Sequence, residues 1–485
     1  MEENSLISPA SETIPLLVDL DGSLVGTDTL YEMVATLIRS NPIVAILIPF
    51  WLIRGKSYLK QELFHRVKLN VDALPYREEV IDYLRLEHKC GRRIILVTGS
   101  WHKLAEQICD KFDFFDDCAG TDDNVNLTGR NKANWANETY GKGNYDYLGN
   151  EEKDLLVWEH ARKSIVVGNK ALLSKALSVS ELGMHINIEK AGISTYLRAI
   201  RVHQWPKNAL VFVPLFAAQL ATDISSIFLV TLGFLAFCCC ASGTYIFNDI
   251  FDLDFDRQSS IKRSKPIASG KLAIPKAVFI STILLALSIA IALALNKYFL
   301  GVLVSYFVVA SLYSYKLKSL QTVDVIALAG LSTLRIIAGA AAISVPLSFW
   351  LMSFSMVLFF SLAIARRVSE ILSQEQGIKE TKDKVSEYGY YLSDIPILQS
   401  LGSASGLISI IMFAQYISSD QAVGFYRNPQ ILWLVCPVLG YWIVRIWMLT
   451  ARGQMNRDSI SFAITDRNSV LAGLLIGLIF TLASA

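Results

Sequence analysis

Two groups of acidic residues in this sequence have the residue types and the spacing that phosphate chemistry needs. The first is in DLDGS, where Asp19 and Asp21 flank one residue directly after the apolar run IPLLV. On an extended chain alternate side chains point to the same side, so both carboxylates are expected together at the end of a strand. One carboxylate can then attack a phosphorus atom while the other carries a proton to the leaving oxygen. Such a site would also need Mg²⁺, a lysine and hydroxyl or backbone donors to neutralise the phosphate oxygens.

The second group begins within an apolar run, in YIFNDIFDLDFD, and has the spacing N-D-x-x-D-x-x-x-D. Its members are Asn248, Asp249, Asp252 and Asp256, and spacings of three and four place the three carboxylates on one helix face. Three like charges at a membrane boundary repel unless divalent cations lie among them. The cations could hold a diphosphate, and three basic residues downstream could bind further phosphate oxygens: Lys262, Arg263 and Lys265. A solvated loop with incidental acids is less favoured, because the acids begin inside the apolar run.

The segments around the first group predict a doubly wound α/β domain. The runs IPLLVDLDGSL, RRIILVTGS and SIVVGN each have the pattern of a short buried strand that ends in polar residues, and helical patterns lie between them. Parallel sheets of this kind carry their site at the carboxyl ends of the strands.

Residues 41–53, NPIVAILIPFWLI, form an apolar segment that is too short to span a membrane. We expect a helix buried in a cap over the site. The alternative is a helix that rests on the bilayer or on the membrane domain.

The distribution of charge divides the chain of 485 residues into two parts. Residues 1–200 carry 51 acidic and basic side chains, whereas the remaining 285 residues carry only 37, too few to cover a water-facing globule of that size. This pattern excludes a single soluble domain, a disordered chain, a collagen-like fibre and a small disulfide scaffold. The net charge of +2 gives no field that favours a nucleic-acid partner. We predict a soluble domain, residues 1–190, and a membrane domain, residues 191–485.

The second part contains nine apolar segments of roughly membrane-spanning length. They are residues 207–222, 224–248, 274–295, 298–315, 323–343, 346–365, 396–417, 430–449 and 468–485. The first is short, and the fifth contains Asp324 and Arg335. The sequence therefore predicts an all-α membrane domain of about nine transmembrane helices.

Basic residues predict the orientation of these spans, because Lys and Arg near span ends favour the cytoplasmic side. With the N-terminus inside, the cytoplasmic loops hold nearly all of them, and the opposite loops hold only Lys297 and Arg427. The seven cysteines form no C-x-x-C pair, and the acidic N-terminus does not have the pattern of a cleaved secretory signal. We expect a multi-pass protein of the inner (plasma) membrane, with the soluble domain and the active-site loops in the cytoplasm.

The first part resembles the haloacid dehalogenase (HAD) phosphatase superfamily over roughly residues 14–170. DLDGS matches its first motif, and the resemblance implies Asp19 as the nucleophile and Asp21 as the acid/base, with Mg²⁺ bound at both. Thr98 in LVTGS matches the second motif, and Lys132 in LTGRNKANW matches the lysine of the third. Both are implied to bind the phosphate, under a helical cap.

The fourth HAD motif is matched only in part, by GNEEKD. Asp154 is present as an implied metal ligand, but Asn150 stands where a second acid is expected. The loss of one charge beside Mg²⁺ leaves two alternatives for this domain, a working phosphatase or a binding or scaffold role.

The second part resembles the UbiA superfamily of intramembrane prenyltransferases over about residues 195–485. The acidic group and the following KRSKPIASG match its diphosphate motif. The resemblance implies nine transmembrane helices around a cavity that faces the cytoplasm, a polyprenyl substrate, and a diphosphate bound with Mg²⁺. It assigns the metal to Asp249, Asp252 and Asp256, of which the first two are implied to be catalytic.

Three segments are similar to the decaprenyl-phosphate phosphoribosyltransferase branch rather than to the aromatic prenyltransferases: RVHQWPKN, YSYKLKSLQTVDVIALAGLSTLRIIAGA and ARRVSE. A second D-x-x-x-D motif is absent, while Asp324 and Arg335 stand eleven residues apart on one helix face. In that branch the lipid phosphate attacks the anomeric carbon of phosphoribosyl diphosphate. The side chains expected to bind substrate are Lys207, Lys316, Lys318, Asp324, Arg335, Arg366 and Arg367. The loop lysines and arginines could instead serve only membrane topology.

Together the two resemblances predict a bifunctional enzyme that builds a polyprenyl-phosphate sugar for a cell-envelope glycan and then removes its 5-phosphate. One alternative is transfer of a prenyl group from a prenyl diphosphate to an aromatic or other small acceptor. A transporter with a regulatory soluble domain is least favoured, because paired inverted repeats with broken spans are not evident.

Overall fold

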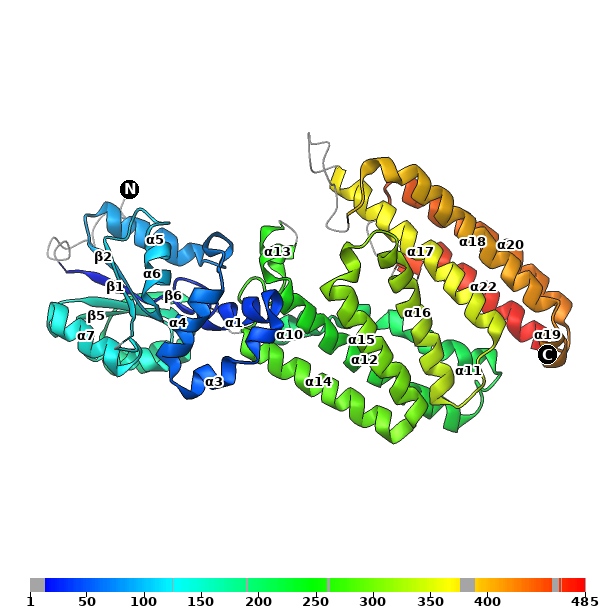
Figure 1. Cartoon of the computed structure of the whole chain (residues 1–485), viewed down its shortest axis with the longest axis horizontal. Helices are drawn as coiled ribbons and strands as arrows, with labels where there is room; N and C mark the ends of the chain where they lie inside the picture. The colour runs from blue at the N-terminus through cyan, green and yellow to red at the C-terminus, as the bar shows by residue number, and fades with distance from the viewer. Residues whose placement is uncertain are drawn as a thin grey trace. The chain divides into compact units, whose positions relative to one another are not determined.

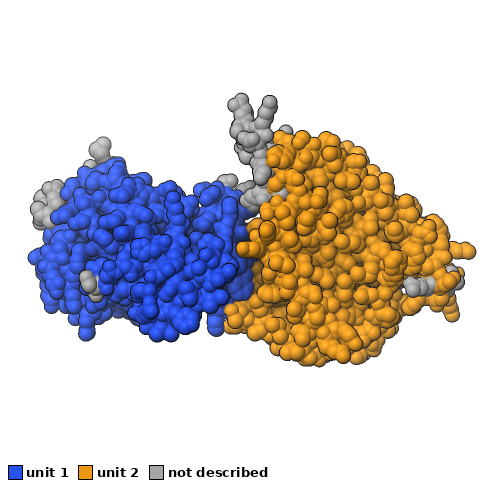
Figure 2. Space-filling model, viewed as in Figure 1, with its two compact units in different colours: residues 1–200, 246–280 blue, residues 201–245, 281–485 orange. Residues whose placement is uncertain are grey.

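The computed structural model describes residues 14–123, 125–188, 191–259, 262–375, 389–455, 462–463 and 465–484 (Figure 1). The chain divides into two compact units (Figure 2). Unit 1 comprises Met1–Ile200 and Ile246–Ile280, and unit 2 comprises Arg201–Tyr245 and Ser281–Ala485. The boundary expected after residue 190 remains a prediction about the domains. The acidic motif of the membrane part packs in unit 1, together with the N-terminal domain.

Unit 1 contains a sheet of six parallel strands in the order β3-β2-β1-β4-β5-β6. The strands are β1 (Leu16–Val18), β2 (Ile94–Trp101), β3 (Asp117–Thr121), β4 (Asp146–Gly149), β5 (Lys163–Gly168) and β6 (Glu181–Asn187). The three apolar runs in the sequence form β1, β2 and β5, so the doubly wound α/β prediction is confirmed. The strand order reverses at β1, between β2 and β4, and ligands of such sheets bind beyond the carboxyl ends at that point.

Both faces of the sheet are covered by helices. Leu16 and Val18 of β1 pack in one buried cluster, whereas Leu17 packs in the other. The first cluster includes residues of α1 (Thr29–Ser40), α4 (Lys56–Arg66), α5 (Glu78–Lys89) and α6 (His102–Cys109). The second includes residues of α7 (Arg130–Tyr140), α8 (Leu155–Trp158) and α9 (Lys170–Leu177). Burial on both faces explains why the strands are continuous apolar runs in the sequence.

Unit 1 contains five further short elements besides the two helices within residues 41–53. They are η2 (Val71–Ala73), η3 (Glu152–Asp154), α10 (Ile193–Ile200), α13 (Leu253–Gln258) and η5 (Lys262–Ser264). Of these, α13 carries Asp256 of the acidic motif, and η5 follows the motif in the chain.

The apolar segment at residues 41–53 forms two short helices, α2 (Pro42–Ala45) and α3 (Ile48–Ile53). The expectation of a buried cap helix is wrong, because Trp51 is the one buried side chain of these two helices. Four large apolar side chains are mostly exposed: Ile43 at 78%, Ile46 at 67%, Phe50 at 62% and Ile53 at 83%. Pro42 begins α2, and Pro49 lies in the first turn of α3. Because a proline disrupts a helix that would continue through it, residues 41–53 do not form one long helix that could pack along the domain.

Eight helices in the described part of the chain are long and apolar enough to cross a membrane. They are α12 (Ile224–Phe251), α14 (Ile274–Leu295), α15 (Lys297–Tyr315), α16 (Val323–Ala342), α17 (Phe349–Glu375), α18 (Ile395–Ile417), α20 (Val435–Ala451, with η8 at Pro429–Leu434) and α22 (Arg467–Ser484). Short helices η6 (Leu317–Ser319), η7 (Leu392–Asp394) and α19 (Asp420–Phe425) connect them. The helical membrane domain is confirmed, and eight candidate spans within the described residues compare with the prediction of about nine.

The difference lies in the first predicted span, residues 207–222. These residues belong mostly to a 3-10 helix, η4 (Val202–Phe212), and to α11 (Val213–Ala217). Pro206 lies inside η4 and Pro214 in the first turn of α11, so the segment does not continue as one α-helix. At about 2.0 Å per 3-10 residue and 1.5 Å per α-helical residue, the two pieces are together about 30 Å long. That length is comparable with the hydrocarbon core, so the predicted orientation stays compatible with the fold.

Unit 2 brings η4 into close backbone contact with α16 at Gly339. A Cβ atom at Gly339 would overlap the carbonyl oxygen of Val211 and meet the ring of Pro214. A side chain at this position would therefore push the two helices apart.

Gly339→Ala is expected to lower the melting temperature of the purified protein by several degrees or to prevent folding, because the clash is with backbone and cannot be relieved by a rotamer change. Gly330→Ala is the matched control in the same helix, where a Cβ atom would meet open space. The control should be neutral or slightly stabilising. Size-exclusion chromatography shows whether each variant folds, and thermal unfolding gives its melting temperature. Equal changes in melting temperature for the two variants would contradict this packing.

Candidate active sites

Asp19 lies directly after β1, where the strand order reverses. Its backbone N–H donates to the carbonyl of Leu148 in β4 at 2.9 Å, which holds the turn against the neighbouring strand. One carboxylate oxygen accepts from Lys132 Nζ at 2.5 Å, and the other accepts from Ser23 Oγ at 3.0 Å. The aspartate and the lysine that the motifs predicted are therefore in direct contact, although they are far apart in the sequence.

Asp21 accepts hydrogen bonds from the backbone N–H of Thr29 and from Ser100 Oγ, both at 2.8 Å. The predicted phosphate-binding residue Thr98 is fully buried, and its hydroxyl accepts from the N–H of Ser100 at 3.0 Å. The structure thus places Ser100 against Asp21 and Thr98 behind it. The motif contained a signal for this, because residues 98 and 100 of a strand point to the same side.

Asp154 is held by three donors. Its Oδ2 accepts from the N–H groups of Asn150 and Glu151 at 2.8 Å each, and its Oδ1 accepts from the hydroxyl of Tyr147 at 2.9 Å. Tyr147 also accepts from Lys132 Nζ at 2.9 Å, so it joins the fourth motif to the third. The sequence reasoning missed this tyrosine, because a tyrosine in a buried strand carries no motif of its own.

The charges at this site depend on one another. Burial raises the pKa of Asp19, although Lys132 opposes the shift. Burial and then the charge of Asp19 raise the pKa of Asp154 to about 6. Burial alone would lower the pKa of Lys132, but the carboxylates of Asp19 and Asp154 raise it above its usual value. The lysine is therefore the positive charge that allows two carboxylates to be buried together.

The oxygen atoms around Ser23 fit a magnesium ion in their chemistry. Its hydroxyl lies 3.0 Å from Asp19 Oδ2 and 3.0 Å from Asn150 Oδ1, and its single proton can satisfy one of them. Carboxylate and amide oxygens are the ligands that Mg²⁺ prefers, usually completed by water and substrate phosphate. No cluster of three acidic, histidine or cysteine side chains suited to a metal occurs within the described ranges, either here or at the acidic motif.

Lys60 on α4 and Asp28 are two titratable groups near Asp21 that the sequence did not indicate. Lys60 Nζ donates to Asn126 Oδ1 at 2.8 Å and to the carbonyl of Gly99. Burial lowers the pKa of Lys60 to about 8, and burial followed by repulsion from Asp21 raises the pKa of Asp28 to about 7. A lone lysine in a cap helix carries no sequence signal, because only the fold brings it to the strand ends.

The acidic motif lies where α12 ends and α13 begins. Lys265 joins two of its carboxylates, because its Nζ lies 2.8 Å from Asp249 Oδ1 and 2.6 Å from Asp256 Oδ2. Asp252 occupies the break between the helices, with φ −93° and ψ 12°. The helix is interrupted at Asp252, but Asp252 N–H still donates to Asn248 O at 2.9 Å and Asp256 N–H to Asp252 O at 2.8 Å. Asp249 and Asp256 therefore meet at Lys265, as their spacing on one helix face predicted.

These groups fit a divalent cation. The amide oxygen of Asn248 is buried and has no hydrogen-bond partner among the described residues, which is rare for a buried polar atom. Asn248 is next to Asp249 in the chain, and the carboxylates of Asp249 and Asp256 are both buried. Oxygen ligands of this kind suit Mg²⁺. Lys262 and Arg263 lie on η5, the first half-buried and the second exposed.

Arg335 lies within α16 and is 5% exposed. Its guanidinium donates to Asn208 Oδ1 at 2.8 Å, to the hydroxyl of Tyr306 at 3.2 Å and to the carbonyl of Leu331 at 2.7 Å. Asn208 follows the predicted residue Lys207, which is also buried. The structure thus links the segment RVHQWPKN to Arg335 through an asparagine that the sequence analysis passed over.

Asp324 and Arg335 belong to different clusters of unit 2. Asp324 is fully buried, and its carboxylate accepts from Arg367 Nε and from the hydroxyl of Tyr390 at 2.6 Å. Arg367 also donates to Glu370 and to the hydroxyl of Tyr313 at 2.5 Å. Since eleven residues span about 16 Å of α-helix, one small group cannot contact both Asp324 and Arg335 directly.

The remaining predicted cations also lie in unit 2, Arg366 within α17 and Lys316 and Lys318 after the end of α15. Arg366 pairs with Glu370, with Nε 2.9 Å from Oε1. Lys316 is exposed after the end of α15, and Lys318 is half-buried on η6. Their predicted roles in binding phosphate remain predictions.

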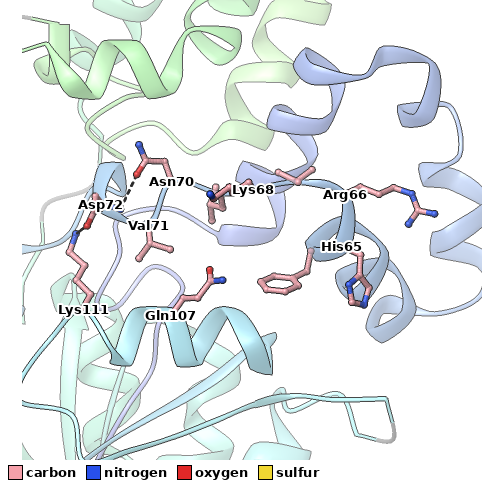
Figure 3. Close-up of a pocket in the computed structure, with 11 residues that line it drawn as sticks. His65, Arg66, Lys68, Asn70, Val71, Asp72, Gln107 and Lys111 are labelled. Atoms are coloured by element: carbon pink, nitrogen blue, oxygen red, sulfur yellow. Dashed lines mark hydrogen bonds and ion pairs between the residues drawn. The ribbon is translucent and has the colours of Figure 1, made fainter.

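A pocket of about 740 Å³ opens in unit 1 between the end of α4, η2 and α6 (Figure 3). Four of its lining side chains are basic or can become so: His65, Arg66, Lys68 and Lys111. Lys111 is paired with Asp72 across the pocket, with Nζ 2.8 Å from Oδ1 (Figure 3). None of the residues that line it belongs to the motifs, so the pocket is separate from the two candidate sites.

Comparison with known proteins defines the class of this chain. The sequence model of the UbiA prenyltransferase family matches residues 209–472, more than half of the chain, and the protein belongs to that family. The model of the haloacid dehalogenase-like hydrolases matches residues 16–143, so the N-terminal domain is HAD-like. The protein is thus a multi-pass membrane protein with an α/β domain before its spans.

Individual relatives share different parts of this architecture. The uncharacterized protein y4nM of Sinorhizobium fredii is 34% identical over 97% of this chain and 91% of its own length. Nodulation protein NoeC of Azorhizobium caulinodans is 31% identical over 60% of the chain and 94% of its own. The decaprenyl-phosphate phosphoribosyltransferase of Corynebacterium glutamicum is 30% identical over 40% of the chain and 59% of its own. A solved UbiA homolog from Archaeoglobus fulgidus, bound to GPP and Mg²⁺, has a TM-score of 0.45 at 18% identity, over 59% and 97% of the two chains.

The shift at Asp28 predicts a pH-dependent gain from Asp28→Asn. The pKa of Asp28 is about 7 in the folded protein and 3.8 in the unfolded chain, so the folded state binds a proton on Asp28 more tightly. Protonated Asp28 therefore favours folding at low pH, and this contribution is lost as the pH rises from about 4 to about 7. The variant removes the charge and keeps the side-chain oxygen that accepts from Leu30 N–H to cap α1. Calorimetry should show a higher melting temperature than wild type at about pH 8, by a few degrees, and little difference at about pH 4. A gain of the same size at both pH values would contradict the shift.

Proposed function

We propose that this protein transfers 5-phosphoribose from phosphoribosyl diphosphate to a polyprenyl phosphate, with Mg²⁺ as cofactor. The observation that carries the proposal is the cluster in which Lys265 bridges Asp249 and Asp256 beside the orphaned oxygen of Asn248. Such a cluster can exchange its lysine for a divalent cation with a bound diphosphate. The similarity to decaprenyl-phosphate phosphoribosyltransferases supports the choice of donor and acceptor.

In this reaction an oxygen of the lipid phosphate forms a bond to the anomeric carbon of ribose, and the bond from that carbon to pyrophosphate breaks. Mg²⁺, when bound, would neutralise the leaving pyrophosphate. Asp249, Asp252 and Asp256 would hold the cation, and Lys265, which contacts Asp249 and Asp256, would then be available to donate to the phosphate oxygens. Lys262 and Arg263 on the next short helix extend this positive side of the site.

The HAD-like domain would remove the 5-phosphate from the product. Asp19 attacks phosphorus, the bond to the ribose oxygen breaks, and Asp21 gives that oxygen a proton. Water then releases phosphate from Asp19. Lys132 holds Asp19 in position, and Ser100 and Thr29 orient Asp21. A tethered phosphatase meets the product at raised effective concentration.

The proposal places the protein in the inner membrane with the HAD-like domain and the acidic motif in the cytoplasm. The distribution of Lys and Arg in the loops supports this orientation. Both phosphorylated substrates would then be reached from the side where they are made.

Prenyl transfer from a prenyl diphosphate is the second candidate. It is favoured by one observation, the 36% identity to digeranylgeranylglyceryl phosphate synthase of Methanocaldococcus jannaschii over 117 residues, which cover 24% of the chain and 39% of that relative. The same acidic cluster would then hold the diphosphate of the prenyl donor. The two candidates differ in which substrate carries the diphosphate, so the assay below separates them.

Purified protein, phosphoribosyl diphosphate, polyprenyl phosphate and Mg²⁺ should yield a lipid-linked phosphosugar, detected by mass spectrometry. Asp249→Asn should lower the rate by about 100-fold or more, the scale on which lost stabilisation of a leaving group acts. Asp19→Asn is the matched control and should leave transfer unchanged while the phosphorylated product accumulates. Consumption of a prenyl diphosphate without phosphoribosyl diphosphate would replace the first proposal by the second, and an unchanged product ratio with Asp19→Asn would remove the phosphatase from it.

A further inference from the structure

A buried ion pair in unit 1 joins the HAD-like domain to the segment that follows the acidic motif. Glu32 lies on α1, and Arg257 lies on α13, directly after Asp256. The two side chains face each other with two contacts, Nη2 to Oε1 at 2.7 Å and Nη1 to Oε2 at 3.1 Å. Only 3% of the Glu32 side chain and 5% of the Arg257 side chain are exposed. A two-pronged pair of this kind fixes orientation as well as distance.

Arg257 also holds the loop that carries Lys265. Its third donor, Nε, gives a hydrogen bond to the carbonyl of Ala268 at 2.9 Å. Ala268 is three residues after Lys265, which in turn contacts Asp249 and Asp256. One guanidinium therefore connects α1, α13 and the lysine loop, and the loop meets the acidic cluster.

A second contact lies two helical turns further along α1. The guanidinium of Arg39 lies 4.5 Å from the ring centre of Phe255, and its Nη1 lies 3.8 Å from Asp254 Oδ2. Residues seven apart lie on nearly the same face of a helix, so Arg39 and Glu32 present one face of α1 to α13. This ion pair is partly exposed, so it contributes little to the free energy of unfolding, but it helps to orient α13 against α1.

The backbones also meet. At Gly270, which has a φ of +72°, a Cβ atom would lie against the backbone of Gly26. Gly26 belongs to the loop between Asp21 and α1, and Gly270 ends the segment KPIASG. The segment from α13 to Gly270 therefore contacts the HAD-like domain at three places: Arg257 at Glu32, Phe255 and Asp254 at Arg39, and Gly270 at Gly26.

We propose that Glu32 is a positioning residue for the transferase site. Through Arg257 it holds Asp256 and the Lys265 loop in the arrangement that receives a diphosphate with its cation. The HAD-like domain then has a second role that does not depend on its own phosphate chemistry. This inference rests on the proposed diphosphate site.

The charge of Glu32 is what Arg257 needs from the HAD-like domain. Without the carboxylate of Glu32, the guanidinium of Arg257 is buried with an unmatched charge. The acidic side chain next to it in the chain is Asp256, so Arg257 would compete with the cation for that carboxylate. Binding of a diphosphate would therefore weaken even where the fold is intact.

The test uses the purified full-length protein with Mg²⁺ and inorganic pyrophosphate, followed by isothermal titration calorimetry. Glu32→Gln and Arg257→Lys should each raise the Kd for pyrophosphate by about tenfold or more, the scale of lost outer-shell contacts at metal sites. Lysine keeps the charge of Arg257 but cannot make the two-pronged contact. Glu62→Gln is the matched control, because Glu62 forms an ion pair with Arg66 within α4 and has no contact with α13 that the structure records.

The outcomes separate the two proposals. If wild-type protein binds no pyrophosphate with Mg²⁺, the proposed function fails and this inference fails with it. If wild type binds and both variants bind equally well, the proposed function stands and the positioning role is wrong. A purely structural role would lower the melting temperature and leave the Kd of the folded fraction unchanged, which also contradicts the inference. Where Glu32→Gln does not fold, Arg257→Lys decides alone.

The exposed apolar side chains of α2 and α3 carry a second, independent inference. They are Ile43, Ile46, Phe50 and Ile53, and we name them the α2–α3 surface. The segment Pro42–Ile53 is apolar but shorter than a span. Two exposed basic residues, Arg54 and Lys56, follow it directly. Apolar side chains next to basic ones are the composition of helices that lie in the interface of an anionic bilayer.

We infer that the α2–α3 surface inserts into the anionic lipid interface of the membrane that this protein spans. The chain is anchored by its own transmembrane helices, so the surface reaches a bilayer without a separate binding event. Insertion would remove its apolar side chains from water, and the lysine and arginine would meet lipid phosphates.

Phe50→p-benzoylphenylalanine in the full-length protein tests this in membranes that contain anionic phospholipid. Irradiation should give a protein–lipid adduct, seen as a mass increase. Leu86 on α5, which is 63% exposed and outside the α2–α3 surface, is the matched position and should give little adduct. A cross-link from position 50 to protein, or a lipid yield no higher than that from position 86, would overturn the inference.

Discussion

A charge that is buried away from water needs an opposite charge beside it, and this constraint shapes both candidate sites. Lys132 pairs with Asp19, and Lys265 pairs with Asp249 and Asp256. Removing one member of such a buried pair typically costs about 3–5 kcal/mol, because the other charge remains without compensation. The lysines therefore compensate the charge of carboxylates that the fold buries close together.

Under the proposed function, the same pairing leaves a lysine available for a bound phosphate. A lysine that neutralises carboxylates can turn to an incoming phosphate, and a divalent cation can then take its place among the oxygens. In both the HAD-like site and the acidic motif a lysine pairs with buried carboxylates, although the two folds differ. One builds its group at the ends of parallel strands, and the other builds it where a transmembrane helix ends.

The pairing of charges also explains why the two parts of the chain are not independent. Arg257 follows Asp256 in the membrane part, yet its buried partner Glu32 belongs to the HAD-like domain. In unit 2 the same rule produces a different result, because Asp324 is neutralised by Arg367 within its own helices. Buried arginines thus join the HAD-like domain to the acidic motif in one unit and fix helix packing in the other.

Much of the fold follows from local patterns. Apolar runs that end in polar residues predicted β1, β2 and β5, and the long apolar segments predicted eight of the observed spans, because period and length are local properties. The first predicted segment, residues 207–222, directly follows Pro206 and contains Pro214, and these prolines prevent one continuous α-helix.

The sequence by itself determined the two families, the motifs and the residues that could do chemistry. The tertiary structure decided which of them meet: Ser100 contacts Asp21, and Arg367 rather than Arg335 pairs with Asp324. It also brought Tyr147 and Lys60 to the strand ends and left the α2–α3 surface exposed. The physical reason is that a motif records residue types and spacing along the chain, whereas a buried charge finds its partner across distances that only the packed fold sets.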